Sequence, residues 1–184
     1  MRLFVALAVP DSVRAAIASL LRELKPLDRS WKFVPAENLH VTLNFLGEVA
    51  MEKLPNVVGA LQSAATAGTV TLAFRGLGFF PNERRPRVLW VGMDDRPSLF
   101  ALAAGVKAAL AGAGLPHEER EFAPHLTLAR NKTAGITPEL RDAIAGCATR
   151  QLGTMNASTF HLIESKLESS GAEYTTLESF RLTR

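Results

Sequence analysis

The fold is decided by residues 37–48, which read ENLHVTLNFLGE, and by a second copy of the motif at their centre. The tetrapeptide at 40–43, HVTL, returns at 125–128 as HLTL. In both copies polar and apolar residues alternate, which predicts a half-buried strand in which every second side chain shares a face. Each copy therefore supplies one histidine, His40 or His125, on a rigid strand.

The spacing also gives each histidine a hydroxyl neighbour. Alternation places His40, Thr42 and Asn44 on one face, and His125 and Thr127 on one face of the other strand, with apolar residues beneath. Two such strands side by side would present two imidazoles and two hydroxyls around one small anion. The hydroxyls can donate hydrogen bonds to phosphate oxygens.

This set of groups suits in-line cleavage of a phosphodiester without a metal ion. Imidazole titrates near neutral pH, so one histidine can take the proton of an attacking water while the other protonates the leaving alkoxide. Two other interpretations remain open. The histidines are partly buried strand residues bonded to the backbone, or they are two ligands of a metal site, which needs further ligands; no HExxH motif is present to supply them.

Composition limits the class of protein. The chain has 184 residues, of which 47% are hydrophobic and 21% charged, as expected for one globular domain or two small lobes sharing a core. A single cysteine, Cys147, excludes an internal disulfide framework and fits a reducing cytosol. No apolar run approaches the ~20 residues of a membrane helix, and we interpret the apolar start as a buried strand of an unexported protein. Arginine outnumbers lysine, which suits a phosphate-bearing ligand.

Helices and strands are mixed along the chain. Asp11 is expected to cap the first helix, Thr137 followed by Pro138 to start the last, and Ser169-Ser170-Gly171 to form a turn. Hairpin-like neighbours favour an α+β domain over a doubly wound sheet. The predicted strands cover 2–9, 31–34, 39–45, 69–80, 87–93, 122–129, 158–167 and 174–182, and the predicted helices 12–24, 52–65, 97–111 and 138–144.

The paired motifs and their flanks resemble the two-histidine (2H) phosphoesterases. The resemblance is closest to the bacterial and archaeal RNA 2′,3′-cyclic phosphodiesterases, also called 2′-5′ RNA ligases. It implies one bilobal α+β domain over residues 1–184, with two antiparallel sheets lining a central groove, helices outside and pseudo-two-fold symmetry. The stretches that carry it are 2–7, 31–35, 37–48, 79–81, 84–90, 122–130 and 174–182.

The resemblance also implies an activity. Such proteins open RNA 2′,3′-cyclic phosphate ends to 2′-phosphomonoesters without metal or cofactor, and some join RNA weakly and reversibly through a 2′-5′ linkage. His40 would be the proton donor and His125 the proton acceptor. We expect a cytoplasmic monomer, with no membrane partner, that acts on RNA ends such as tRNA fragments or on nucleoside cyclic phosphates. The alternatives are a 2H hydrolase of small cyclic nucleotides or 2′-5′ oligonucleotides, and a non-catalytic RNA-end binder.

Further candidates surround the histidines. Thr42 and Thr127 are expected to bind phosphate. Arg130 belongs to the same family phrase, yet simple alternation puts it on the leucine face, and only a bulge or a strand end after Leu128 would turn it towards His125.

Several residues have both a functional and a structural interpretation. Arg84 and Arg85 lie in a basic loop that either contacts RNA or is a solvated hairpin tip. Phe45 is a candidate to stack on a base, with Trp31, Phe79 and Phe80 as further candidates, although aromatic residues at strand spacing are usually core. We expect an exposed, inert His117 and a structural His161, and assign no chemistry to Cys147.

Overall fold

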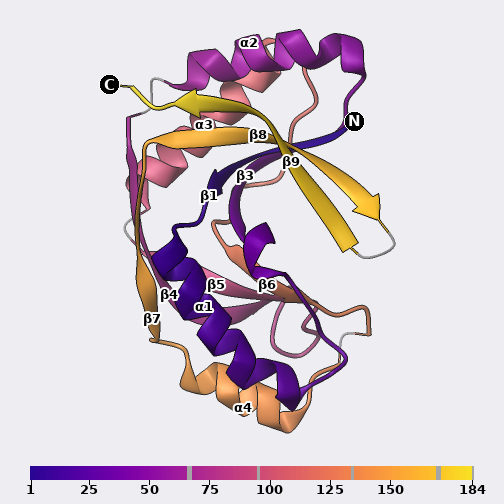
Figure 1. The fold of residues 1–184 in the computed structure, drawn as a ribbon, viewed down its shortest axis with the longest axis vertical. Coiled ribbons are helices and arrows are strands. Elements are labelled where there is room, and N and C mark those ends of the chain that lie inside the picture. Colours follow the sequence, from indigo (N-terminus) through magenta and orange to yellow (C-terminus); the bar gives the residue numbers. More distant parts are fainter. Residues whose placement is uncertain (66–67, 95, 134, 169–170, 184) are drawn as a thin grey trace.

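Two antiparallel sheets form the frame of the protein, seen in a computed structural model that describes residues 1–65, 68–94, 96–133, 135–168 and 171–183 (Figure 1). The four-stranded sheet has the order β3-β1-β8-β9, with β1 at Arg2–Ala8, β3 at His40–Glu48, β8 at Thr159–Glu168 and β9 at Gly171–Arg181. The five-stranded sheet has the order β2-β6-β5-β4-β7, with β2 at Lys32–Phe33, β4 at Val70–Phe80, β5 at Val88–Asp94, β6 at Leu126–Arg130 and β7 at Gln151–Ala157.

The helices cover the outer sides of the two sheets. Helices α2 and α3 pack together beside the four-stranded sheet, whereas α1 packs against β7 and α4 against β4 (Figure 1). The α+β fold with two antiparallel sheets and helices outside them is therefore confirmed. The helices are α1 at Asp11–Leu24, α2 at Leu54–Ala64, α3 at Pro97–Gly112 and α4 at Pro138–Gly146, and single 3-10 turns lie at Lys25–Leu27, Ala36–Asn38 and Met51–Lys53.

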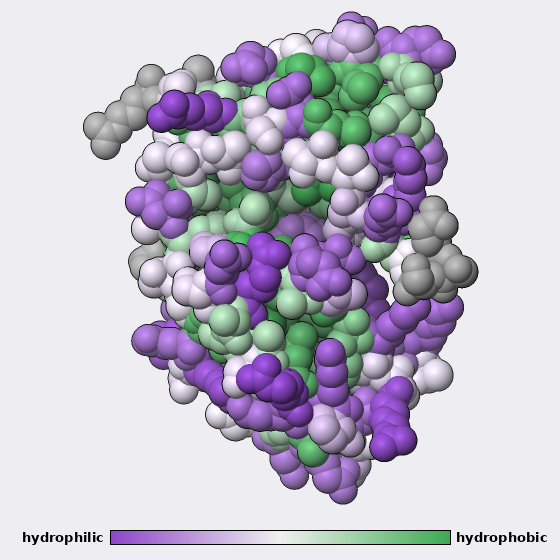
Figure 2. All heavy atoms as spheres, viewed as in Figure 1, coloured by the Kyte–Doolittle hydropathy of each residue, from purple (hydrophilic) through white to green (hydrophobic). Residues whose placement is uncertain are grey.

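The chain passes repeatedly between the sheets, so each sheet contains strands from both halves of the sequence. The two motif strands, β3 and β6, belong to different sheets and contact each other. In the surface view, hydrophilic side chains gather at mid-height, with apolar side chains showing above and below them (Figure 2). The topology thus brings two motifs that lie far apart in the sequence to the junction of the sheets.

Most predicted elements are confirmed, including the Thr137 cap, whose hydroxyl accepts from the Leu140 amide at 3.2 Å. The cap at Asp11 is wrong: Pro10 holds the N-cap position, and Asp11 is a helical residue whose carboxylate lies 3.8 Å from Arg14. The strand expected over 122–129 begins only at Leu126.

Strand β7 was not predicted. A register shift opposite Phe74 and Arg75 leaves one extra residue in β7, so its buried residues, Leu152 and Met155, are three positions apart rather than two. The bulge removes the alternation by which strands are recognised. Residues 169–170 of the expected turn lie outside the described part of the chain, and Gly171 begins β9.

The described residues contain no helix that is both long and apolar enough to cross a membrane.

Candidate active site

Both motif histidines are held in the same way. His40 is the first residue of β3, and its Nδ1 lies 2.7 Å from the carbonyl oxygen of Asn38. His125 directly precedes β6, and its Nδ1 lies 2.7 Å from the carbonyl oxygen of Ala123. Because a carbonyl only accepts, each Nδ1 must carry the hydrogen, which leaves each Nε2 to exchange a proton with a ligand.

The electrostatics place the two imidazoles and one arginine in a common environment. Burial lowers the pKa of His40 below its usual 6.5, the bond to Asn38 opposes this, and the charges of Arg130 and His125 lower it further. Burial likewise lowers the pKa of His125, again with a contribution from Arg130. At neutral pH both rings therefore favour the neutral form, and the protonated form of either is a stronger acid than free imidazole.

Thr42 and Thr127 lie on the faces of their strands that carry the histidines. Thr42 is opposite Ala6 in β1, and Thr127 is opposite Trp90 in β5. Both are half-buried, and neither hydroxyl has a hydrogen-bond partner among the described residues. The expected phosphate-binding hydroxyls are therefore positioned to donate to a ligand.

A β-bulge lies at the last residue of each motif. Residue Leu43 is extra in β3, because Thr42 pairs with Ala6 while Asn44 pairs with Val5, and residue 128 is extra in β6 in the same way. Each bulge reverses the alternation by one residue. The residue five positions after each histidine consequently lies on the histidine face.

These two residues are Phe45 and Arg130. Phe45 is 42% exposed, and its ring lies 5.9 Å from that of Phe4. Arg130 is exposed and acts electrostatically on His40 and His125. The structure thus meets the condition under which Arg130 could turn towards the histidines.

The bulge has the opposite effect on Asn44. Simple alternation placed it beside His40, which is wrong: Asn44 is 4% exposed, and its Oδ1 accepts from the Glu118 amide at 3.0 Å. Lys107 of α3 donates to the Glu119 carbonyl at 2.7 Å. Strand β3 and α3 thereby anchor the segment that leads to His125.

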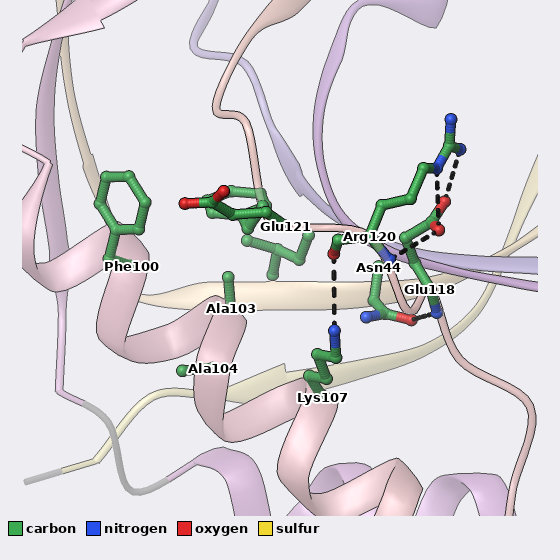
Figure 3. Close-up of a pocket in the computed structure, with 10 residues that line it drawn as sticks. Asn44, Phe100, Ala103, Ala104, Lys107, Glu118, Arg120 and Glu121 are labelled. Atoms are coloured by element: carbon green, nitrogen blue, oxygen red, sulfur yellow. Dashed lines mark hydrogen bonds and ion pairs between the residues drawn. The ribbon is translucent and has the colours of Figure 1, made fainter.

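This segment borders a hollow of about 230 Å³ on the far side of β3 (Figure 3). Its lining includes Asn44, Phe100 and Phe122, and the two phenylalanine rings meet edge to face at 5.5 Å. None of its lining residues is a histidine. The hollow therefore lies behind the motif strand rather than between the imidazoles.

Aromatic rings account for the burial of the histidines. The His40 ring lies 4.8 Å from Phe4 and 5.3 Å from Tyr174, and the His125 ring lies 4.9 Å from Phe80. Phe80 in turn contacts Trp90 at 5.2 Å. Each imidazole thus has an apolar wall on one side.

The stacking candidates divide into two groups. Phe45 is exposed and contacts Phe4, which in turn contacts His40, and Phe80 is half-buried and contacts His125. Trp31 and Phe79 are only 4% and 7% exposed and pack on each other at 5.7 Å. A stacking role for these two is wrong, because they belong to the core.

The basic loop lies between β4 and β5. Arg84 and Arg85 are exposed, and their backbone amides donate to Asn82 Oδ1 at 3.0 and 3.1 Å. The loop begins after Phe80, which contacts His125. The two guanidinium groups are therefore carried by a loop that starts at the site.

His161 lies on the same sheet face as Thr42, because both are paired with Ala6, whereas His117 and Cys147 lie outside the motif strands. His117 is half-buried rather than exposed, with Nδ1 2.9 Å from the Leu115 carbonyl, and His161 of β8 bonds the Ser179 hydroxyl at 2.9 Å. Cys147 is buried with a free thiol. Within the described residues, no three His, Cys, Asp or Glu side chains gather as a metal site would require.

Three neighbours of His40 were not singled out from the sequence: Phe4, Asn38 and Tyr174. The contacts of Phe4 and Tyr174 with His40 join segments far apart in the chain, whereas Asn38 lies two residues before His40. All three fall within the stretches that carry the family resemblance, and that resemblance is the signal that could have identified them.

We expect Gly78→Ala to destabilise the protein and impair the site. A Cβ at Gly78 would overlap the Trp90 ring, which supports Phe80 beside His125. Displacing the ring should cost about 1–3 kcal/mol in the free energy of unfolding, measured with denaturant. The control is Gly59→Ala in α2, where a Cβ meets nothing within 4 Å and should stabilise the helix. An unchanged stability of Gly78→Ala would contradict this packing.

Comparison with a known protein family also shows the two-fold repeat of the motif. The family model described as LigT like phosphoesterase matches the chain twice, over residues 7–90 and 91–174. Each match contains one histidine motif at nearly the same distance from its start. The duplication seen in the motifs therefore extends over both halves of the sequence.

Relatives cover nearly the whole chain. An RNA 2′,3′-cyclic phosphodiesterase of Archaeoglobus fulgidus is 38% identical, over 98% of this chain and 99% of the relative. One of Thermus thermophilus is 35% identical, over 99% of this chain and 90% of the relative. Among solved structures, TT0787 of Thermus thermophilus has a TM-score of 0.81 at 34% identity, covering 99% of this chain and 98% of that one. E. coli LigT complexed with 3′-AMP has a TM-score of 0.79 at 30% identity, covering 100% and 98%.

Proposed function

Because this chain belongs to the LigT-like phosphoesterase family, we propose that it hydrolyses RNA 2′,3′-cyclic phosphate ends, with His40 and His125 as its acid and base. The observation that carries the proposal is the matched pair of imidazoles. Each is fixed through Nδ1 to a backbone carbonyl, so that each Nε2 can exchange a proton. The RNA 2′,3′-cyclic phosphodiesterases among its relatives, and the 3′-AMP complex of E. coli LigT, support a terminal nucleotide as substrate.

In the proposed reaction, His125 takes a proton from water as the water oxygen attacks phosphorus. The bond from phosphorus to the 3′ oxygen breaks, and protonated His40 gives its proton to that oxygen. The products are a 2′-phosphate and a free 3′-hydroxyl. If the 5′-hydroxyl of a second RNA attacked phosphorus in place of water, the same steps would form a 2′-5′ linkage and free the 3′-hydroxyl. Attack of that 3′-hydroxyl on the linkage would release the second RNA and re-form the cyclic phosphate, so the joining would be reversible.

Three further side chains serve the phosphate. Thr42 and Thr127 carry free hydroxyls on the histidine faces, and Arg130 brings a positive charge to the same place. Negative charge builds on the non-bridging oxygens during attack, and preorganised donors stabilise it more than they stabilise the ground state. We propose these three groups as the phosphate-binding set.

The pH profile of kcat/KM should be bell-shaped, because the base must be neutral and the acid protonated. His125 governs the acidic limb and His40 the alkaline limb. Since burial lowers the pKa of both, the maximum should lie on the acidic side of neutral. A rate that rises steadily to high pH would contradict a histidine acid.

Chelation should leave the rate unchanged. The two imidazoles account for both proton transfers, so the proposed steps need no metal-bound water. The test is turnover before and after dialysis against EDTA. A strong loss that one divalent ion restores would overturn the mechanism.

RNA should be preferred to a mononucleotide. Arg84 and Arg85 can contact backbone phosphates beyond the terminal one, and Phe45 can stack on a base. We expect the double variant Arg84→Ala/Arg85→Ala to lower kcat/KM for a short RNA on the order of tenfold in low salt, while sparing a nucleoside 2′,3′-cyclic phosphate.

The matched control replaces two arginines on outer helices, Arg22 of α1 and Arg141 of α4, with the same change in net charge. Equal losses on both substrates would show that the basic loop does not bind RNA. If the wild-type protein turned over only the mononucleotide, a small cyclic nucleotide would be its substrate. Binding of the RNA end without turnover would show a non-catalytic binder.

We further propose that residues 1–184 act as one bilobal domain and as a monomer in the cytoplasm. One chain supplies both motif strands, which contact each other, so the site needs no second copy. Specific activity should then be independent of protein concentration, with a monomer mass in sedimentation. Activity that falls on dilution would indicate an obligate oligomer.

A further inference from the structure

Three contacts link His40, Asn38 and strand β9. The carbonyl oxygen of Asn38 accepts from His40 Nδ1 at 2.7 Å, and the side-chain Nδ2 of Asn38 donates to the carbonyl oxygen of Ala172 at 2.9 Å. Two residues further along β9, the ring of Tyr174 meets the His40 ring edge to face, at 5.3 Å and 84°. The contacts therefore lead from His40 through Asn38 to β9, and from Tyr174 of β9 back to His40.

Sheet order makes these contacts unusual. Strands β3 and β9 form opposite edges of the four-stranded sheet, with β1 and β8 between them. For Tyr174 to reach His40, the β8–β9 hairpin must curl over the face of β1. Phe4 of β1 lies beneath, 5.2 Å from Tyr174 and 4.8 Å from His40. The hydrogen bond from Asn38 to Ala172 fastens the hairpin in this position.

We propose that Asn38 is a positioning residue that closes the β8–β9 hairpin over His40. Its carbonyl oxygen orients the imidazole, and its side chain holds the hairpin whose Tyr174 ring shields the imidazole from water. This inference rests on the proposed role of His40 as the general acid. Asn38 and Tyr174 act on the reaction through His40.

The physical consequence concerns both orientation and solvation. Burial is the largest cause of the lowered His40 pKa, and Tyr174 and Phe4 supply apolar surface on that ring. The titratable groups that act on His40 are Arg130 of β6, His125 before β6 and Tyr174 of β9. Opening the hairpin would remove only Tyr174 from His40 and would admit water to the imidazole. The His40 pKa should therefore rise.

The test uses Asn38→Leu, which removes the amide donor without adding charge and leaves the backbone carbonyl in place. NMR titration of the imidazole signals should show the pKa of His40 rising towards 6.5 while that of His125 stays unchanged. The alkaline limb of the kcat profile should move to higher pH, and kcat at the optimum should fall on the order of tenfold as the acid loses its orientation.

The positioning of His40 by Asn38 and Tyr174 is called the clamp below. Four further variants separate the loss of this clamp from a general loss of structure. Asn38→Gln keeps an amide donor and should restore part of the wild-type profile. Tyr174→Leu should reproduce the effect of Asn38→Leu, whereas Tyr174→Phe keeps the shielding ring and should leave the His40 pKa near its wild-type value. Asn56→Leu, on the exposed face of α2, is the matched control.

The outcomes distinguish a failure of the clamp from a failure of the proposed acid role of His40. An unchanged His40 pKa in folded Asn38→Leu, or in Tyr174→Leu if the first variant does not fold, overturns the clamp whatever happens to activity. A His40 pKa that moves without any change in the kcat profile supports the clamp and removes His40 from the acid role in the proposed function.

Discussion

Replacement of His40 or His125 by alanine is expected to lower kcat on RNA 2′,3′-cyclic phosphate on the order of 10²–10⁴-fold, the range for loss of a general acid or base. Each imidazole is fixed at Nδ1, so its Nε2 is oriented before substrate arrives. Alanine removes both the proton carrier and its orientation. KM should change far less than kcat, because the hydroxyls and Arg130 still hold the phosphate.

The double variant should lose less than the product of the two single losses, since the residues act as a unit. His117→Ala, in the segment before His125 and outside both motif strands, is the matched control. Near-native turnover by either His40→Ala or His125→Ala, with the fold intact, would remove that residue from the mechanism.

The histidine motifs could be predicted from the sequence because their information is local. Alternation places His40 with Thr42 and His125 with Thr127 without knowledge of any partner strand. The turn-and-cap chemistry at Thr137 is local in the same sense and was correct. The predicted cap at Asp11 is wrong because Pro10, which has no side-chain acceptor, already occupies the N-cap position.

The positions of Phe45, Asn44 and Arg130 could not be predicted in this way. Their orientation depends on two β-bulges, and a bulge is a property of the register between two strands. One extra residue moves Asn44 to the core and brings Phe45 and Arg130 towards the histidines. Nothing in residues 40–48 or 125–130 alone marks where the extra residue falls.

The contact of Tyr174 with His40 is even harder to predict from the sequence. It needs β9 to curl over β1 and β8, so it depends on the shape of a whole sheet rather than on a pattern in one strand. Strand β7 shows the same limit, because pairing with β4 decides where its bulge lies. Local patterns therefore identify the reacting groups, and tertiary structure decides what surrounds them.

The product of hydrolysis is expected to be almost entirely the 2′-phosphomonoester with a free 3′-hydroxyl. In-line attack requires the base and the acid to flank the phosphorus, which two imidazoles on separate strands can do. If His125 activates water opposite the 3′ oxygen, only that oxygen lies beside His40. Thr42, Thr127 and Arg130 would hold the non-bridging oxygens and prevent the ring from turning to present its 2′ bond. Phosphorus NMR of the product resolves the two isomers.

A substrate with sulfur at the 3′ position separates the acid from the base. A thiolate leaves readily without protonation, so it makes a general acid unnecessary. On this substrate His40→Ala should recover most of its lost rate, whereas His125→Ala should remain slow because water still needs a base. Rescue of His125→Ala instead would mean that His125 is the acid and His40 the base. A 3′-phosphate from the natural substrate would mean that the cyclic phosphate binds the other way round, with its 2′ oxygen beside the acid.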